Sequence, residues 1–269
     1  MVKKLFKHEY LFYARVMALV YGILLTISVA TRLIYTFESD TTAYQIIRGF
    51  TTIVYVVSMM AAWGFAWVMS IVRFYRNLFT SEGYLTFTLP VTSAQHIIVK
   101  AVTAVSVEWI TYVMIAISAL IVVPWAYLAE FFEGFGMLFS GFYEVAGIHA
   151  VLFGIELFAL AVLASFAGIM LYYCFISIGQ MSKKNRILAA VGAYFAYYIL
   201  TQVLSTIFTV MLSVFAATGV FESWGYWIIE HPVASIHLLM CTGILLAAVF
   251  LLLEFLLVRR IITKKLNLE

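Results

Sequence analysis

The sequence predicts an all-α membrane protein with six transmembrane helices, organised as a single transmembrane domain over residues 1–269. Hydrophobic residues make up 65% of the chain and charged residues only 11%, whereas a soluble domain carries roughly a quarter charged residues. The apolar residues gather in six stretches, each long enough to supply the about 20 residues with which a helix crosses a bilayer. Alternating strand patterns of about ten residues are absent, which excludes a transmembrane β-barrel. The predicted spans are Val16–Tyr35, Phe50–Val72, Ile97–Val123, Ile148–Gly179, Ile187–Phe215 and Ile236–Val258.

Residues 1–15 are expected to form a helix that lies in the cytoplasmic membrane interface before the first span. Apolar and aromatic side chains recur there at helical spacing, and basic residues lie mostly on the opposite face, as in interfacial amphipathic helices. The apolar face consists of Val2, Leu5, Phe6, Tyr10 and Tyr13. A simple basic anchor is the alternative. We expect the first span to remain in the protein rather than to be removed as part of a signal peptide, because its apolar run is long enough to cross the membrane.

Residues 73–96, between the second and third spans, are the most informative part of the chain. They begin with RFYRNLFTSEGYLTFTLPVT, whereas a loop that only returned the chain to the membrane would be shorter and more polar. Gly83 interrupts the segment, and Pro90 prevents easy helical continuation. Thr92 and Gln95 form a Thr-x-x-Gln capping box that predicts the start of the third span. We interpret the segment as a short cytoplasmic helix and turn that contacts another molecule, with an interfacial aromatic belt as the alternative.

Two segments on the opposite side of the membrane, residues 124–147 and 216–235, are too polar to span and too aromatic to be free loops. The first contains three glutamates and several glycines, and the second contains Trp224, Trp227 and Pro232. Aromatic residues of this kind gather at membrane interfaces. Both segments are therefore predicted to be extracellular, as surface-lying helices that either cover an outward opening or anchor the protein. For residues 216–235 a re-entrant segment is the alternative.

The basic residues set the predicted orientation. Of the 16 Lys and Arg residues, 14 lie on the side of the membrane that holds both chain ends, and only Arg32 and Arg48 lie on the other. Because positively charged loops remain in the cytoplasm, we expect both termini to be cytoplasmic and the protein to be a multi-pass protein of the cell membrane. The 14 residues are Lys3, Lys4, Lys7, Arg15, Arg73, Arg76, Lys100, Lys183, Lys184, Arg186, Arg259, Arg260, Lys264 and Lys265.

Three glutamates lie within predicted spans, where an unpaired carboxylate is costly. Glu254 is close in sequence to Arg259 and Arg260 and is expected to form an interfacial ion pair with them. Glu108 and Glu156 lie deeper. Each is predicted either to contact a cationic substrate or to bond a neighbouring span for packing.

The fifth span contains no charged residue and carries a polar-aromatic stripe that includes Tyr194, Tyr198, Gln202 and Ser205. Such a stripe suits a cavity that receives an amphiphile, and a buried hydrogen-bonding seam is the alternative. The five histidines do not form an H-E-x-x-H pattern, and the two cysteines show no metal-ligand spacing. We therefore expect no catalytic residue and no metal site, and the chain is not predicted to be an enzyme.

Together, the six spans, the cytoplasmic ends, the amphipathic first helix and the 73–96 segment resemble the permease subunits of ABC transporters of the type-2 exporter family. The resemblance covers the whole chain, and its most specific part is Arg73–Val91. This run is similar to the coupling segment that docks on the ATPase in small permeases of Gram-positive bacteria. The resemblance therefore implies a bacterial protein of the plasma membrane.

The resemblance implies an exporter that moves a hydrophobic or amphipathic substrate, such as a peptide, drug or lipid, by alternating access. Since the chain has no G-x-x-x-x-G-K-[ST] loop, ATP and Mg²⁺ are expected on separate ABC ATPase subunits, and this chain is expected to bind no cofactor and no nucleic acid. A second permease subunit, identical or paralogous, completes the implied dimer within membrane lipid. The implied ATPase-coupling residues are Arg73, Arg76, Glu82, Tyr84, Phe87 and Leu89. The alternative is a non-transporting membrane sensor or scaffold coupled to an ATPase.

Overall fold

A computed structural model describes residues 2–37, 39–80, 83, 88, 90–220 and 222–264. Within these residues the chain forms eight helices and no strand, so the predicted all-α fold is confirmed. Six of the helices are long and apolar enough to cross a membrane, and each contains most or all of one predicted span. These six are α1 (Val2–Thr36), α2 (Thr42–Phe79), α4 (Ser93–Val122), α6 (His149–Gly179), α7 (Arg186–Ala217) and α9 (Pro232–Lys264).

The chain folds into two compact units, which are Met1–Ser140 and Gly141–Glu269. The first contains α1, α2 and α4, and the second contains α6, α7, α9 and the short helix α8 (Glu222–Glu230). Helix α5 (Trp125–Ala146) carries the chain from one unit into the other. The predicted segments outside the membrane, residues 124–147 and 216–235, therefore contain the helices α5 and α8.

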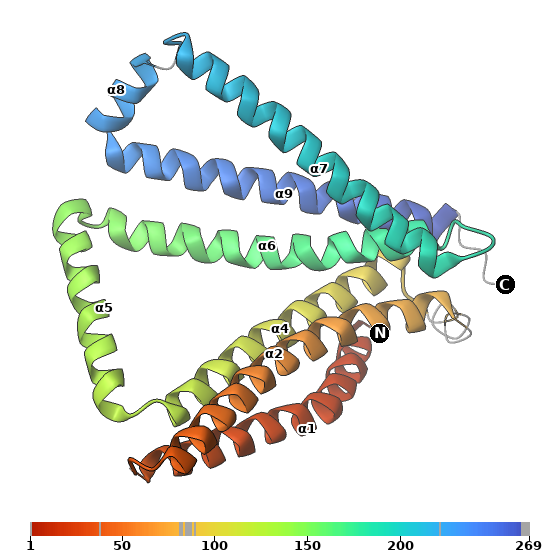
Figure 1. Ribbon diagram of the computed structural model, residues 1–269. Helices are drawn as coiled ribbons and strands as arrows, with labels where there is room; N and C mark the ends of the chain where they lie inside the picture. Colours follow the sequence, from red (N-terminus) through yellow and green to blue (C-terminus); the bar gives the residue numbers. More distant parts are fainter. Residues whose placement is uncertain are drawn as a thin grey trace. The chain divides into compact units, whose positions relative to one another are not determined.

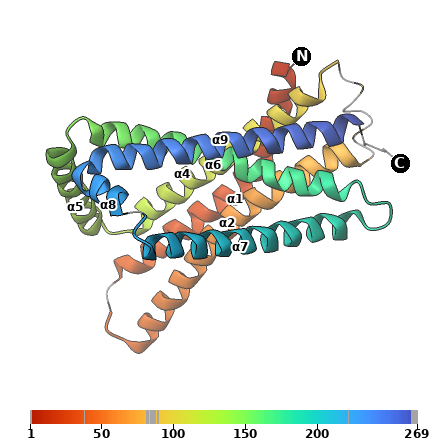
Figure 2. The same cartoon turned by 90° about the horizontal axis from the view of Figure 1, so that it is seen from above.

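The first unit is a three-helix body in which α1 packs against both α2 and α4 (Figures 1 and 2). Tyr13 and Met17 of α1 are buried against Ala66 of α2 and Val107 of α4. A second cluster lies further along the same helices and includes Ala62. Alanines one helical turn apart allow α2 to approach its neighbours closely, as small residues do between membrane helices.

Helix α1 runs without a break from Val2 to Thr36 and curves near its amino-terminal end (Figure 1). Residues 2–15 therefore continue directly into the first span instead of forming a separate helix before it. Of the predicted apolar face, Tyr13 is buried and Tyr10 is exposed, and Glu9 is buried on the same side. The placement of residues 1–15 flat in a membrane interface stays a prediction.

The second unit is built around α6 and α9, which run side by side (Figures 1 and 2). Near the amino-terminal end of α6, Ala150 and Phe153 are buried with Ala146, and Val233 and Ile236 of α9 pack against them. Helix α7 has no buried residue. It lies close to α6 at its start and diverges from it toward α8, which returns the chain to α9 (Figure 1).

Gly179, at the end of α6, lies where the backbones of α6 and α7 approach closely. A Cβ atom at Gly179 would lie 2.6 Å from the carbonyl oxygen of Arg186 and 2.7 Å from the Cβ of Ala190. Such distances are shorter than real carbon contacts, so only a residue without a side chain fits at this crossing. The contact between α6 and the first turns of α7 therefore depends on glycine at this position.

Candidate functional site

A buried cluster of charged and polar side chains joins the three helices of the first unit. The Glu9 carboxylate of α1 accepts a bond from Arg73 Nε of α2 at 3.1 Å and from Lys100 Nζ of α4 at 3.0 Å. Asn77 Nδ2, one turn beyond Arg73, donates at 3.2 Å to Glu9 Oε1, the oxygen that also accepts from Lys100. We call Glu9, Arg73, Asn77 and Lys100 the Glu9 cluster.

Burial makes the Glu9 cluster energetically important. The side chains of Glu9 and Lys100 are each only 4% exposed, and that of Arg73 is 21% exposed. The Arg73 guanidinium also lies over the ring of Phe12, 4.0 Å from its centroid, a favourable cation–π arrangement. A buried charge is strongly destabilising once its partner is removed. The Glu9 cluster therefore fixes the positions of α1, α2 and α4 relative to one another at this end of the unit.

The Glu9 cluster lies next to the predicted coupling segment. Arg73 and Asn77 belong to the last two turns of α2, which ends at Phe79 with Phe74 and Leu78 fully buried. Across the connection, the backbone N–H of Gln95 donates to Thr92 Oγ1, and the backbone N–H of Thr92 donates to Gln95 Oε1. The predicted capping box is thus confirmed at the start of α4.

Of the predicted ATPase-coupling residues, the structure describes two. Arg73 is engaged with Glu9, and Arg76 is exposed on α2 and makes interactions of its own. The other four lie outside the described residues; they are Glu82, Tyr84, Phe87 and Leu89. Their role in docking stays a prediction.

Glu108 belongs to a second polar chain in the first unit. Its carboxylate accepts a hydrogen bond of 2.9 Å from the hydroxyl of Tyr112, one turn along α4. The indole N–H of Trp63 on α2 donates to that hydroxyl at 3.3 Å. Because Trp63 and Tyr112 are 44% and 43% exposed, these hydrogen-bonded side chains lie on the outer face of the unit. This geometry gives Glu108 a link between α2 and α4, and contact with a substrate stays a prediction.

Glu156 lies at the end of a hydrogen-bonded chain of three side chains in the second unit. His149 Nδ1 is 2.9 Å from His237 Nε2, and His237 Nδ1 is 2.7 Å from Glu156 Oε1. These hydrogen bonds join α6 to α9. Phe153 packs on the His237 ring with 4.3 Å between centroids. Glu156 Oε2 is buried without a hydrogen-bond partner. The structure thus supplies the inter-helix bonding that was one of the two predicted roles of Glu156.

Replacing His237 with alanine is expected to lower the free energy of unfolding of the second unit by about 1–3 kcal/mol. The reason is that Glu156 Oε1 then loses its hydrogen bond to His237 in a half-buried site. The measurement is detergent-induced unfolding of the purified protein, followed by circular dichroism. The double variant Glu156→Leu with His237→Leu should recover part of the loss, because both polar groups are removed together. Exposed His8 provides the matched control, and an equal loss from His8→Ala would contradict the prediction.

Glu254 does not form the predicted ion pair with Arg259 and Arg260. Within the described part of α9 no such contact is present, and Glu254 Oε2 is buried without a hydrogen-bond partner. The reason is helical geometry, since side chains face each other at spacings of three or four residues, and these two arginines follow at five and six. The backbone oxygen of Glu254 instead accepts from Cys174 Sγ at 3.4 Å.

The predicted stripe on the fifth span lies on the exposed surface of α7. The aromatic ring of Tyr194 contacts that of Phe175 on α6, with 5.7 Å between centroids, whereas Tyr198 is 52% exposed. Gln202 and Ser205 are exposed as well. Within the second unit, then, the outer part of the stripe is not a buried seam, and its contact with an amphiphile stays a prediction.

The structure also identifies site residues that the sequence patterns did not. Glu9 is the one acidic residue among the first 37, and it lies three and four residues from Phe6, Leu5 and Tyr13 on the apolar face, which is the signal that points to it. His149 and His237 are 88 positions apart, and no sequence spacing pairs them. No group of three or more His, Cys, Asp or Glu side chains that could hold a metal ion occurs among the described residues.

Comparisons with protein-family models, with curated proteins and with solved structures found no match to this chain. A functional proposal therefore depends on the geometry described above and on the pattern of residues 73–96.

Proposed function

We propose that this chain is the membrane-spanning permease subunit of an ATP-driven ABC exporter. A separate ATPase hydrolyses ATP, and a second permease subunit, identical or paralogous, completes the membrane part. Both termini and the basic loops are cytoplasmic in this proposal, as the positive-inside rule favours. The cargo is a hydrophobic or amphipathic molecule.

The Glu9 cluster is the observation that supports this proposal best. It attaches the last two turns of α2 and the first two turns of α4 to α1, on both sides of residues 80–92. A segment that receives a displacement from a partner must be fixed to rigid elements at both ends, because switching transitions are carried by packed elements rather than by loose chain. A connection that merely crossed back would need no buried charges beside it.

The proposed mechanism follows from this attachment. ATP binding brings the ATPase subunits together, and residues 80–92 move with the subunit on which they dock. Because α1, α2 and α4 share the Glu9 cluster, the three helices follow as one body, and the transporter passes from inward-open to outward-open states with different partner contacts. The exposed polar groups of α7 and the partly buried Glu108 then face the pathway, where they avoid the cost of contact with lipid. These groups are Glu108, Tyr194, Tyr198, Gln202 and Ser205.

The double variant Tyr84→Ala with Phe87→Ala is expected to abolish transport-coupled ATP hydrolysis and to leave membrane insertion intact, because buried aromatic anchors carry most of the energy of an interface. The measurement is substrate-stimulated ATPase activity of the reconstituted complex, together with retention of the ATPase by tagged permease. Tyr127 and Phe131, which are exposed aromatic residues of α5, give the control Tyr127→Ala with Phe131→Ala. Unchanged hydrolysis and unchanged retention in the first variant would refute the docking role.

Vesicle transport separates the exporter from a membrane sensor that uses an ATPase only for signalling. Inside-out vesicles that contain both subunits should accumulate an amphipathic substrate when ATP is supplied. A sensor would bind the ATPase and alter its activity without accumulating substrate, and that result would replace the proposal with the alternative function.

A further inference from the structure

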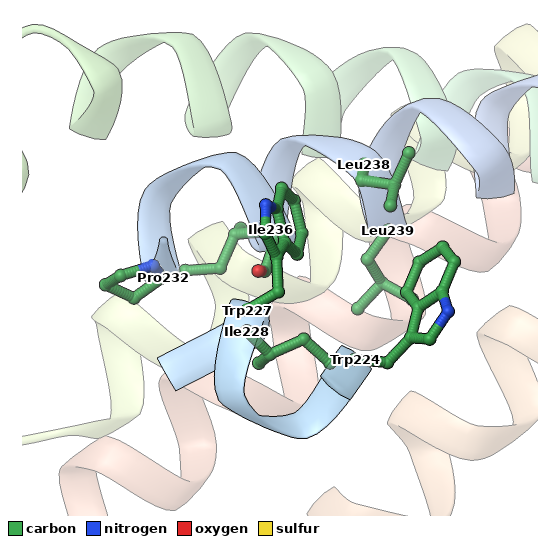
Figure 3. Close-up of a pocket in the computed structure, with 8 residues that line it drawn as sticks. Trp224, Trp227, Ile228, Pro232, Ile236, Leu238 and Leu239 are labelled. Atoms are coloured by element: carbon green, nitrogen blue, oxygen red, sulfur yellow. The ribbon is translucent and has the colours of Figure 1, made fainter. Parts of the chain in front are cut away.

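An apolar pocket lies between α8 and the first turns of α9 in the second unit (Figure 3). Its volume is about 530 Å³, which falls within the about 300–1,000 Å³ that is usual for small-molecule sites. The lining is mostly apolar, and Ser235 and the two tryptophans are the lining residues whose side chains carry a polar atom. The main apolar lining residues are Trp224, Trp227, Ile228, Pro232, Ile236 and Leu239.

Two tryptophans form the α8 side of this pocket. Trp224 and Trp227 project from α8 toward α9 (Figure 3), and their ring centroids are 6.5 Å apart. Both also line an adjoining depression of about 490 Å³, with Ser223 and Leu238. The two indoles are 55% and 37% exposed, so a ligand could contact a face of each. Tryptophan at the end of a membrane span lies at the interface, where a ligand with one apolar and one polar end would also lie.

Local contacts fix the shape of the pocket before a ligand arrives. The Trp227 ring stacks on the His231 ring with 5.3 Å between centroids and 19° between planes. The His231 backbone N–H donates to the Trp227 carbonyl at 2.8 Å, and the Ser235 hydroxyl donates to the His231 carbonyl at 2.8 Å. The turn from α8 into α9 is therefore built around Trp227, and the pocket wall is preformed.

The two charged side chains of α8 are both acidic. Glu222 and Glu230 begin and end α8, and both are exposed. Residues 187–258 contain no Lys or Arg, so no lysine or arginine of α8, of α7 beyond its first residue Arg186, or of the first seven turns of α9 can pair with a phosphate or sulfate at this rim. Indole faces attract cations through the ring quadrupole. Charge complementarity therefore favours a cationic head group and disfavours an anionic lipid.

We propose that this pocket binds a small cationic amphiphile. Its apolar chain lies against Trp224, Trp227 and Leu239, and its positively charged head group lies at the Glu230 end of α8, next to the lining residue Pro232. The site belongs wholly to the second unit, and its binding does not depend on an ATPase or on the function proposed above.

The test uses the full chain in phosphatidylcholine nanodiscs and a decyltrimethylammonium probe that carries a photoreactive diazirine at the chain end. Cross-links are mapped by mass spectrometry, with unlabelled decyltrimethylammonium or decyl sulfate as competitor. We expect cross-links in residues 222–239, displaced by the ammonium compound at a concentration about tenfold lower than by the sulfate, because charge and cation–π terms both favour the cation. Partitioning into lipid alone would give no preferred segment.

Two variants and two matched controls complete the test. Glu222→Gln with Glu230→Gln should remove most of the tenfold preference while cross-linking persists, and Trp224→Leu with Trp227→Leu should remove the cross-links. The controls are Glu144→Gln and Trp125→Leu, which alter exposed residues of α5 and should change neither result. Equal competition by the two compounds, a preference for the sulfate, an undiminished preference for the ammonium compound in Glu222→Gln with Glu230→Gln, or unchanged cross-linking in a folded Trp224→Leu with Trp227→Leu would overturn the proposal. The charge variant leaves the pocket wall intact, so it decides the question even if the tryptophan variant does not fold.

Discussion

Replacing Glu9 with glutamine is expected to lower the free energy of unfolding of the first unit by about 3–5 kcal/mol, the largest effect among the substitutions considered. Glutamine keeps the size of the side chain but removes its charge, so the buried Lys100 and the partly buried Arg73 both lose the Glu9 carboxylate. Removal of one partner from a buried ion pair is costly for this reason. The measurement is the midpoint of unfolding by sodium dodecyl sulfate in mixed micelles, followed by circular dichroism.

Two further variants show whether the effect comes from buried charge. Glu130→Gln on the exposed surface of α5 removes the same charge and should change stability by less than about 0.5 kcal/mol. Lys100→Met added to Glu9→Gln should cost less than the two single changes together, because residues in one network are not additive. An unfolding midpoint of Glu9→Gln equal to that of the unaltered protein would show that the cluster does not stabilise the unit.

A methyl group at Gly179 is expected to destabilise the second unit by about 1–3 kcal/mol, the usual cost of overpacking. In Gly179→Ala the new carbon would lie 2.6 Å from the Arg186 carbonyl oxygen and 2.9 Å from the Ala190 amide nitrogen. Both atoms belong to the backbone of α7, so the clash can be relieved only if α6 and α7 separate. Unfolding of the reconstituted protein and protease sensitivity of residues 180–185 both report this separation.

Gly168, in the same helix, is the matched control. A Cβ there would have no neighbour within 4 Å, and alanine has a higher helix propensity than glycine by about 1 kcal/mol. Gly168→Ala should therefore leave stability unchanged or raise it slightly, the opposite sign to Gly179→Ala. Equal losses in the two variants would mean that helix packing at Gly179 is not responsible.

Much of the fold follows from local sequence patterns. Apolar length predicts the six spanning helices, because a helix in lipid must satisfy its backbone internally. The Thr92 capping box places the start of α4 correctly, since it involves backbone groups only three residues away. The aromatic segments 124–147 and 216–235 contain helices as expected. Each of these predictions uses interactions between residues close in sequence.

The polar clusters depend on which helices pack together, and sequence spacing does not contain that information. The sequence places Lys100 among the residues that set the predicted orientation, whereas in the structure it is buried against Glu9, 91 positions away. Its position inside the apolar run that begins at Ile97 is the one local indication of burial. His237 is 81 positions from Glu156, and only the packing of α6 on α9 brings the two together.

The crossing at Gly179 has a geometric consequence for α7. Ring contacts of Phe175 with Tyr194 and Tyr197 secure α7 near its start, and no residue along its length is buried. From Tyr197 to Ala217 about 30 Å of helix extends beyond those contacts, at about 1.5 Å per residue. A rotation of about 10° at the secured end would displace the far end by about 5 Å, roughly one helical turn. A small change in the angle of α7 at its contacts with Phe175 would therefore produce a large displacement of its carboxyl-terminal end.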